Sequence, residues 1–268
     1  MRMGIDLGGT KTEVAVLDDS GQMRLRERIA TPRESYQATI EALCELIEQA
    51  QAEVGPCDSI GIGAPGSISP ATGLVRNSNT VHLNGRPFDR DLEAKLGRPV
   101  TMRNDADCFT LSEAIDGAGA GASTVFGVIV GTGTGGGLCV HGRLLAGANG
   151  IAGEWGHNPL PWPRPDELPG PPCYCSKHGC IETFLSGPGL LRDYRARPGA
   201  QDVTDAASLV GLGERGDDLA ERVLADELVV DQQPRAGGRH LGDERGEGRD
   251  RERGANHDQQ VALLKVLL

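Results

Sequence analysis

Two glycine turns, each between two apolar stretches, constrain the fold of this chain more than any other feature. The first follows Asp6 and contains Gly8 and Gly9, and the second follows the apolar run 124–130. Glycine has no Cβ, so the backbone can turn sharply there and point its N–H groups at an anion. Two hairpins of the same design predict an α/β fold in which they face each other across a cleft and hold the phosphates of one nucleotide.

The groups beside these turns suit phosphate and a metal ion. Thr10 and Lys11 add donors to the first turn, and the second turn includes Thr132. Asp6, at the end of an apolar strand, is placed to hold Mg²⁺ through water. The first turn does not fit the P-loop pattern, which runs into a helix. For either turn alone, a hairpin whose glycines only make the turn is the alternative, but the repetition favours phosphate binding.

The composition points to a protein that acts on small molecules. Its 268 residues most naturally make one large or two small α/β domains. The net charge of −11 opposes a nucleic-acid-binding surface, which needs a basic face. The chain shows neither a leader nor an apolar run of the roughly 18 residues that a membrane span requires. We therefore expect a cytoplasmic protein that contacts neither nucleic acid nor membrane.

A cluster of metal-ligand side chains occurs between residues 154 and 182. His157, Cys173, Cys175 and Cys180 provide one imidazole and three thiols, the ligand set of a closed tetrahedral zinc site. The other four cysteines stand singly in apolar contexts, and an odd total of seven fits reduced thiols better than a disulfide framework. The spacing predicts a structural zinc ion that fixes the Pro-rich loop between its ligands.

An acidic residue stands where a general base belongs. An apolar stretch ends at Arg103 and is followed by Asn104, Asp105 and a helix. Open α/β sheets bind ligands at the carboxyl ends of their strands, which makes Asp105 a candidate base. The alternative is that Asn104 or Asp105 only caps the helix, and the two roles are compatible.

Three asparagines, Asn77, Asn79 and Asn84, occur in one polar stretch. Their amides either bind sugar hydroxyls or satisfy the backbone of turns. For each asparagine taken singly, turn chemistry is the interpretation that we favour.

Together these motifs resemble those of the ROK family (repressor, open reading frame, kinase). The resemblance is carried by DLGGTKT, GIGAPGSISP, the pair Asn104 and Asp105, GTGTGGG, AGEWGHNPLPW and CYCSKHGCIETF, and GHNPLPW is similar to the fructokinase branch. It covers roughly residues 1–200. It implies an actin-like, ribonuclease H-like ATPase fold of two α/β domains, with ATP and a hexose in the cleft between them.

The resemblance also implies roles for single residues. Asp105 is the expected catalytic base, and the two glycine turns are expected to hold ATP with Mg²⁺. Ser176 stands where the family commonly has glycine, although all four zinc ligands are present. Sugar contacts are implied for Asn79, Asn104, Asp105, Glu154, His157 and Glu182, and phosphate contacts for Asp6, Gly8, Gly9, Thr10, Lys11, Gly131, Thr132 and Gly133.

In this interpretation zinc holds Glu154 and Glu182 on the sugar that Asp105 activates. We therefore expect chelation to lower sugar affinity and stability before it affects phosphate transfer.

The C-terminal part departs from the family pattern. Between Asp231 and Gln260 almost nothing apolar remains, whereas the family has a strand and a glycine-rich loop for adenosine in this region. The composition predicts a charged, disordered tail, and a reading-frame shift near residue 225 is one explanation. The predicted division is an N-terminal domain at 1–118, a partial second domain at 119–225 and the tail at 226–268.

The predicted activity is ATP-dependent phosphorylation of a hexose. The resemblance of GHNPLPW favours fructose, with fructose 6-phosphate as the product, and N-acetylglucosamine, glucose and mannose are alternatives. A sugar-binding remnant without activity is a further alternative because of the tail. A ROK repressor would carry a helix-turn-helix domain before the first glycine turn, where only five residues precede Asp6. The resemblance also implies a homodimer.

Overall fold

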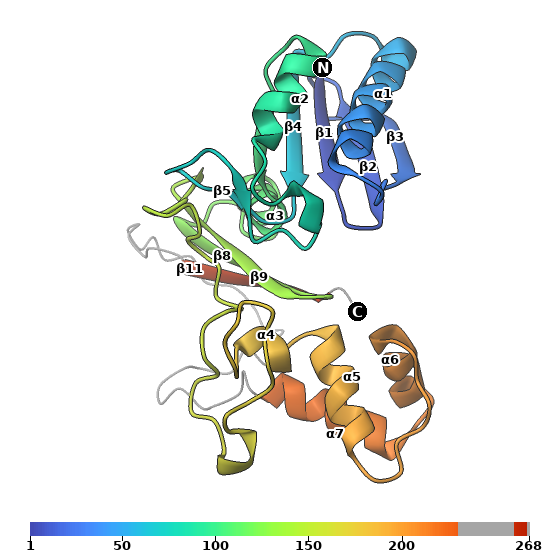
Figure 1. Ribbon diagram of the computed structural model, residues 1–268, viewed down its shortest axis with the longest axis vertical. Coiled ribbons are helices and arrows are strands. Elements are labelled where there is room, and N and C mark those ends of the chain that lie inside the picture. Colours follow the sequence, from blue (N-terminus) through green and yellow to red (C-terminus); the bar gives the residue numbers. More distant parts are fainter. Residues whose placement is uncertain (230–259, 267–268) are drawn as a thin grey trace, which may run out of the picture. The chain divides into compact units, whose positions relative to one another are not determined.

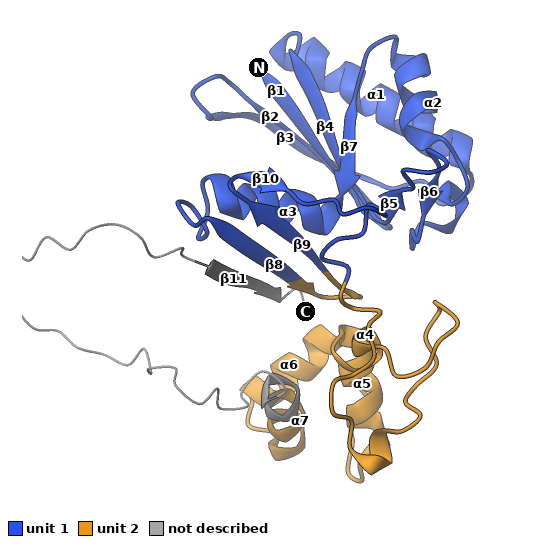
Figure 2. Ribbon diagram, turned by 90° about the vertical axis from the view of Figure 1, so that its left-hand side faces the viewer, with its two compact units in different colours: residues 1–128, 136–154, 261–263 blue, residues 129–135, 155–260, 264–268 orange. Residues whose placement is uncertain are grey.

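The computed structural model describes residues 1–229 and 260–266 (Figure 1). These residues form two compact units (Figure 2). Unit 1 contains residues 1–128, 136–154 and 261–263, and unit 2 contains residues 129–135, 155–229, 260 and 264–266. The division expected between residues 118 and 119 stays a prediction.

A five-stranded sheet forms the centre of unit 1 and has the order β3–β2–β1–β4–β7. Strands β1, β2 and β3 pair antiparallel, whereas β4 runs parallel to β1 and β7 parallel to β4. Buried and exposed side chains alternate along β1, which places Met3, Ile5 and Leu7 in the core. The strand bounds are Arg2–Leu7 for β1, Lys11–Leu17 for β2, Met23–Ala30 for β3, Ser59–Ala64 for β4 and Thr101–Asn104 for β7.

Helices supply the crossover connections that the parallel strands require. Helix α1 packs on β2 and β3, α2 packs on α1, and α3 packs on β4 and β7. Phe88, Leu43 and Ile47 are among the fully buried side chains between the sheet and these helices. The bounds are Tyr36–Val54 for α1, Phe88–Leu96 for α2 and Asp105–Ile115 for α3, with the short elements β5 (Ser67–Ile68), β6 (Val75–Arg76) and η1 (Val81–Leu83) between β4 and α2 in the chain.

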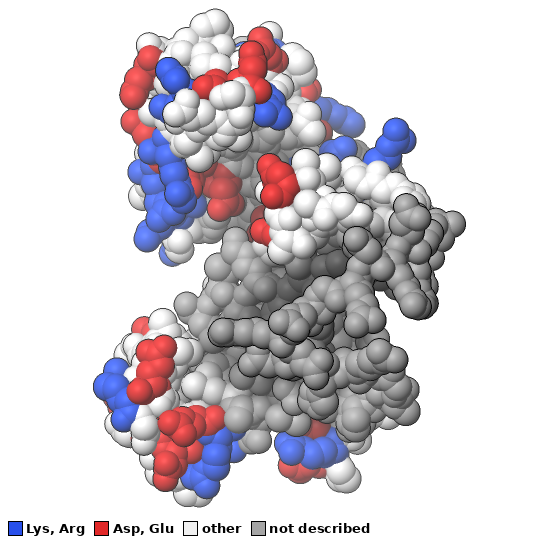
Figure 3. Space-filling view, turned by 180° about the vertical axis from the view of Figure 1, so that it is seen from behind, with Lys and Arg blue, Asp and Glu red and all other residues white. Residues whose placement is uncertain are grey.

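The edge strand β3 is strongly basic on one face. Arg24, Arg26 and Arg28 are exposed there, and Glu13 of β2 accepts hydrogen bonds from the Nε groups of Arg26 and Arg28, both at 2.7 Å. Figure 3 shows Lys and Arg side chains gathered on one side of unit 1. Charged side chains on an edge strand hinder pairing with the edge of another sheet.

A second sheet has the order β10–β9–β8–β11 and contains the second glycine turn between β8 and β9. Helix α3 lies very close to this hairpin at Thr110, whose buried hydroxyl donates to the carbonyl of Ala106 at 2.8 Å. A Cβ added at Gly137 would lie 2.6 Å from Oγ1 of Thr110, and one at Gly127 would lie 2.9 Å from its Cβ. Both positions therefore need glycine. The bounds are Thr124–Val130 for β8, Thr134–Val140 for β9, Arg143–Leu144 for β10 and Gln260–Val266 for β11.

Replacement of Gly127 by Ala is expected to destabilise unit 1. The added methyl group meets the backbone side of Thr110, so α3 has to move off the hairpin, at a cost of about 1 to 3 kcal/mol. Thermal unfolding measures the loss. Gly4→Ala is the matched control, since a Cβ at this strand glycine meets no atom within 4 Å. Equal unfolding temperatures for the two variants would contradict the close packing of α3.

Unit 2 has a helical core of its own, in which Leu190, Tyr194, Leu209 and Val223 are buried together. Helix α6 packs against α7, and α5 contacts both of them. Ser186 begins α5 by accepting a hydrogen bond from the N–H of Gly189. The bounds are Pro165–Glu167 for η2, Ile181–Phe184 for α4, Gly187–Ala196 for α5, Ala206–Glu214 for α6 and Asp218–Val229 for α7.

Most of the predicted C-terminal tail falls on residues 230–259 and 267–268, which lie outside the described residues. Within the described part, α7 continues to Val229 and the apolar run Gln260–Val266 forms strand β11 beside β8. The predicted charged tail at 226–268, most of which lies outside the described residues, stays a prediction. An apolar run of this length can pair with a sheet when an edge strand is available.

No helix of the described chain is long and apolar enough to cross a membrane.

Candidate active site

The first glycine turn of unit 1 is fixed by hydrogen bonds to its own hairpin and to β3. The N–H of Gly8 donates to the carbonyl of Lys11 at 3.0 Å, and the hydroxyl of Thr31 donates to the carbonyl of Gly8 at 2.7 Å. A Cβ at Gly8 would lie 2.7 Å from the carbonyl oxygen of Lys11, so only glycine fits. Gly9 and Thr10 are exposed. Hydrogen bonds at Gly8 thus fix the conformation of the turn, while Gly9 and Thr10 are accessible to a ligand.

Asn104 is the N-cap of α3, as the alternative interpretation of the sequence held. Its Oδ1 accepts from the N–H groups of Ala106 and Asp107 at 2.9 and 3.2 Å. Its Nδ2 donates to the carbonyl of Gly66 at 3.0 Å. Most of the amide is therefore used within the protein, and the predicted sugar contact of Asn104 stays a prediction.

Asp105 is the first residue of α3 and combines an exposed side chain with a perturbed carboxyl group. Protein atoms around the carboxyl limit its hydration and raise the pKa of Asp105 above its ordinary value. The N–H of Ala106, which donates to Oδ1 at 2.8 Å, lowers this pKa, and the negative charge of Asp6 raises it. A carboxylate with a raised pKa that a substrate can reach is suited to accept a proton.

The stretch with three asparagines separates into turn residues and one exposed amide. Asn77 adopts a left-handed backbone with φ of 55°, and Asn84 uses its amide to bond the backbone of Ser78. Both therefore serve the turn, as favoured from the sequence. Asn79 is exposed, and a Cβ at Gly9 would lie 3.8 Å from its Oδ1. The predicted sugar contact Asn79 and the first glycine turn are thus neighbours in unit 1.

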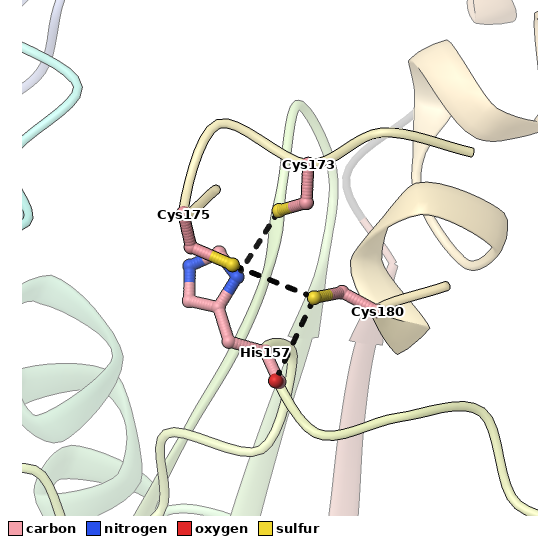
Figure 4. A group of neighbouring side chains, drawn as sticks. All are labelled: His157, Cys173, Cys175 and Cys180. Atoms are coloured by element: carbon pink, nitrogen blue, oxygen red, sulfur yellow. Dashed lines mark hydrogen bonds between the residues drawn. The ribbon is translucent and has the colours of Figure 1, made fainter. Parts of the chain in front are cut away.

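The four predicted metal ligands of unit 2 come together (Figure 4). Their ligand atoms all lie within 4.8 Å of one another. Sγ of Cys173 lies 3.5 Å from Nδ1 of His157, and Sγ of Cys175 lies 3.5 Å from Sγ of Cys180. Tetrahedral zinc with sulfur ligands at about 2.3 Å places neighbouring ligand atoms about 3.7 Å apart. The residues therefore fit a zinc ion of the predicted kind.

Two further observations describe the environment of this cluster. Burial and the neighbouring thiols raise the pKa of Cys180 to about 12, so a thiolate at Cys180 would need a compensating positive charge. Nε2 of His157 lies 2.9 Å from the hydroxyl of Tyr174, which leaves Nδ1 directed at the thiols. Sequence reasoning missed Tyr174, although its position between two cysteine ligands was a signal.

Glu182 has a role that the sequence did not predict. Its Oε2 accepts a hydrogen bond at 2.9 Å from the N–H of Thr134, which follows the second glycine turn. The N–H of Gly187 donates to the carbonyl of Gly131 at 2.7 Å, and the hydroxyl of Thr134 donates to the carbonyl of Leu185. The segment that follows the last metal ligand therefore holds the second glycine turn within unit 2.

The structure thus groups the candidate residues by unit. Unit 1 contains the first turn, Asn79, Asn104, Asp105 and the half-buried Glu154. Unit 2 contains the second turn, Glu182 and the predicted metal ligands. The sugar contacts of Asn79, Glu154 and Glu182 stay predictions.

The model of the ROK family matches residues 2–229, and the chain belongs to this family. It is 39% identical over 227 residues to an N-acetyl-D-glucosamine kinase of Escherichia coli O127:H6. This alignment covers 82% of this chain and 73% of the relative.

Solved structures agree with this assignment. The ROK hexokinase from Thermus thermophilus has a TM-score of 0.70 and 36% identity, covering 85% of this chain and 74% of that one. A ROK family glucokinase from Streptomyces griseus in complex with glucose and AMPPNP has a TM-score of 0.71 and 27% identity. The match covers 85% of this chain and 76% of the glucokinase chain. The predicted fold class, an α/β fold of the actin-like ATPase type, is confirmed, and these relatives are sugar kinases. None of the three is named for fructose.

Proposed function

We propose that the chain is an ATP-dependent hexose kinase that transfers the γ-phosphoryl group of ATP to a sugar hydroxyl. The observation that carries the proposal is Asp105, an exposed residue whose carboxyl group is poorly hydrated and has a raised pKa, in the same unit as the first glycine turn and Asn79. Phosphoryl transfer has a loose transition state, so the protein mainly positions the two substrates and neutralises charge.

In this proposal Asp105 accepts the proton of the attacking sugar hydroxyl. The two glycine turns direct backbone N–H groups at the phosphates, with Thr10, Lys11 and Thr132 as further donors. Asn79, Asn104, Glu154 and Glu182 bind the hexose hydroxyls. Asp6 would hold Mg²⁺ through water, and the ion would offset charge on the phosphates.

His157 is assigned to the metal rather than to the sugar. Its Nδ1 faces Cys173 and its Nε2 faces Tyr174, so both ring nitrogens have partners within unit 2. A zinc ion held by His157, Cys173, Cys175 and Cys180 would have a structural role, because four protein ligands close its coordination.

For the sugar we propose N-acetylglucosamine first, because the relative at 39% identity is a kinase of that sugar. Fructose, which the resemblance of GHNPLPW favoured, has no support among the relatives named above. Glucose and mannose remain candidates, since each of these hexoses displays a similar set of hydroxyls.

A panel of N-acetylglucosamine, glucose, mannose and fructose tests the function. We expect ADP release with at least one of them, measured by a coupled assay, and the highest kcat/KM for N-acetylglucosamine. Phosphorylated sugar must be found in amounts equal to ADP, because ADP without product indicates ATP hydrolysis. A folded protein that binds a sugar but phosphorylates none would instead be the sugar-binding remnant.

The predicted homodimer and the predicted cytoplasmic location stay predictions. Light scattering tests the homodimer.

A further inference from the structure

One side chain of unit 1 lies outside the proposed chemistry and yet holds a residue beside it. Asn84 accepts a hydrogen bond from the N–H of Ser78 through Oδ1 and donates one to the carbonyl of Ser78 through Nδ2, both at 2.9 Å. Ser78 is buried. Buried backbone groups need hydrogen-bond partners, and the amide of Asn84 supplies a partner for each of the two groups of Ser78.

Ser78 connects the loop 77–84, which contains Asn79, with the start of α3. A Cβ at Gly66 would lie 2.8 Å from the backbone nitrogen of Ser78, so the two backbones are in close contact. The carbonyl of Gly66 accepts the hydrogen bond from Nδ2 of Asn104, the residue before Asp105. The position of Ser78 therefore influences Asn79 directly and is tied through Gly66 to the proposed base.

The far end of the same loop is anchored to the core. Nε2 of His82 lies 2.9 Å from the hydroxyl of Thr39 in α1, and Leu83 is fully buried. The hydroxyl of Thr80 lies 3.5 Å from Oδ1 of Asn79. Asn79 lies between Ser78 and His82, which are both held by hydrogen bonds. Its exposed amide is next to Gly9 of the first glycine turn.

We propose that Asn84 is a positioning residue for sugar recognition, which acts by fixing Ser78 so that Asn79 meets the hexose in one orientation. This inference rests on the proposed function. Each polar atom of the Asn84 side chain is bonded to Ser78, and we therefore assign the effect of Asn84 on the sugar to Asn79, a route that the second test below examines.

The first test is the substitution Asn84→Ala. The KM for the hexose is expected to rise on the order of tenfold, because small misplacements of a binding group are costly. kcat and the KM for ATP should stay within about twofold, since the variant loses sugar binding rather than transition-state contacts. Asn84→Asp retains an acceptor for the N–H of Ser78 and should give an intermediate KM. Val81→Ala, at a side chain 76% exposed in the same loop, is the matched control.

The second test is a double-mutant cycle with Asn79→Ala. If Asn84 acts through Asn79, then Asn84→Ala adds nothing to the rise in KM once Asn79 is gone. Additive losses, or an unchanged sugar KM in a folded Asn84→Ala variant, would overturn the inference. Circular dichroism and the unfolding temperature establish that each variant is folded.

Failure of the proposed function can be told apart from failure of this inference. If the wild-type chain phosphorylates no hexose of the panel, the kinase proposal fails. The same cycle is then measured by titration calorimetry with N-acetylglucosamine and with glucose, where the dissociation constant replaces KM. Equal dissociation constants for wild type and Asn84→Ala, or no binding of either sugar by the wild type, would overturn the positioning role.

Discussion

Replacement of Asp105 by Asn is expected to abolish sugar phosphorylation, with a fall in kcat on the order of 10² to 10⁴ that general base catalysis supplies. Asn has the same shape and retains an oxygen to accept the N–H of Ala106, which lies 2.8 Å from Oδ1 in the native chain. Sugar affinity, measured by calorimetry, and metal content should therefore stay nearly unchanged. Wild-type turnover in this variant would refute the assignment of the base.

Asp107→Asn is the control for Asp105→Asn. Burial raises the pKa of Asp107 to about 6, while Arg103 lowers it and Asp105 raises it. Asp107 is thus a second perturbed carboxyl on the same helix, two residues further on. If the loss of a negative charge on α3 were the cause, both substitutions would reduce kcat equally. We expect a large loss of kcat for Asp105→Asn alone.

The pH dependence of activity follows from the same carboxyl group. A base acts only when deprotonated, and burial raises the pKa of Asp105 above its ordinary value of 3.8. kcat/KM should therefore fall as the pH is lowered through that raised pKa, at a higher pH than for an ordinary aspartate. The residual activity of Asp105→Asn should lack this acidic limb.

Loss of the metal cluster is expected to have the second large effect, and the structure changes the form of that effect. The sequence predicted that chelation lowers sugar affinity before it affects phosphate transfer. Glu182, two residues after the ligand Cys180, binds the N–H of Thr134 beside the second glycine turn. We therefore expect Cys175→Ser, or dialysis against a chelator, to raise the KM for ATP as well as that for the sugar.

The metal prediction has readouts besides activity. Atomic absorption should find zinc in the wild-type chain and little in Cys175→Ser, and the unfolding temperature should fall, because binding of a structural metal contributes to folding. Cys139→Ala removes a buried thiol outside the cluster and should keep its metal. Unchanged unfolding temperature and KM values after complete zinc removal would contradict the structural role.

Much of the site was predictable where its geometry is local. The first glycine turn, the N-cap of α3 at Asn104 and the group of His157 with three cysteines each depend on residues close together in the chain. Short spacing restricts which groups can meet, because few backbone conformations connect them. Turn chemistry at Asn77 and Asn84 was also favoured correctly, although the partner of Asn84 was not named.

Other features required the tertiary structure. The bond between Glu182 and Thr134 joins residues 48 apart, and that between Asn104 and Gly66 joins residues 38 apart. Gly127 looks like any strand glycine until α3 is placed against it at Thr110. Likewise β11 is an apolar run whose place beside β8 follows only from the sheet order.

By itself, the sequence determined the family, the fold class, the glycine turns and the four side chains that come together as a candidate metal site, since these follow from residue types and motifs. Only the tertiary structure decided what Glu182, Asn84 and Thr110 do. A carboxylate, an amide or a hydroxyl can serve many partners, and the one that it meets is set by strand register and helix packing over long separations in the chain.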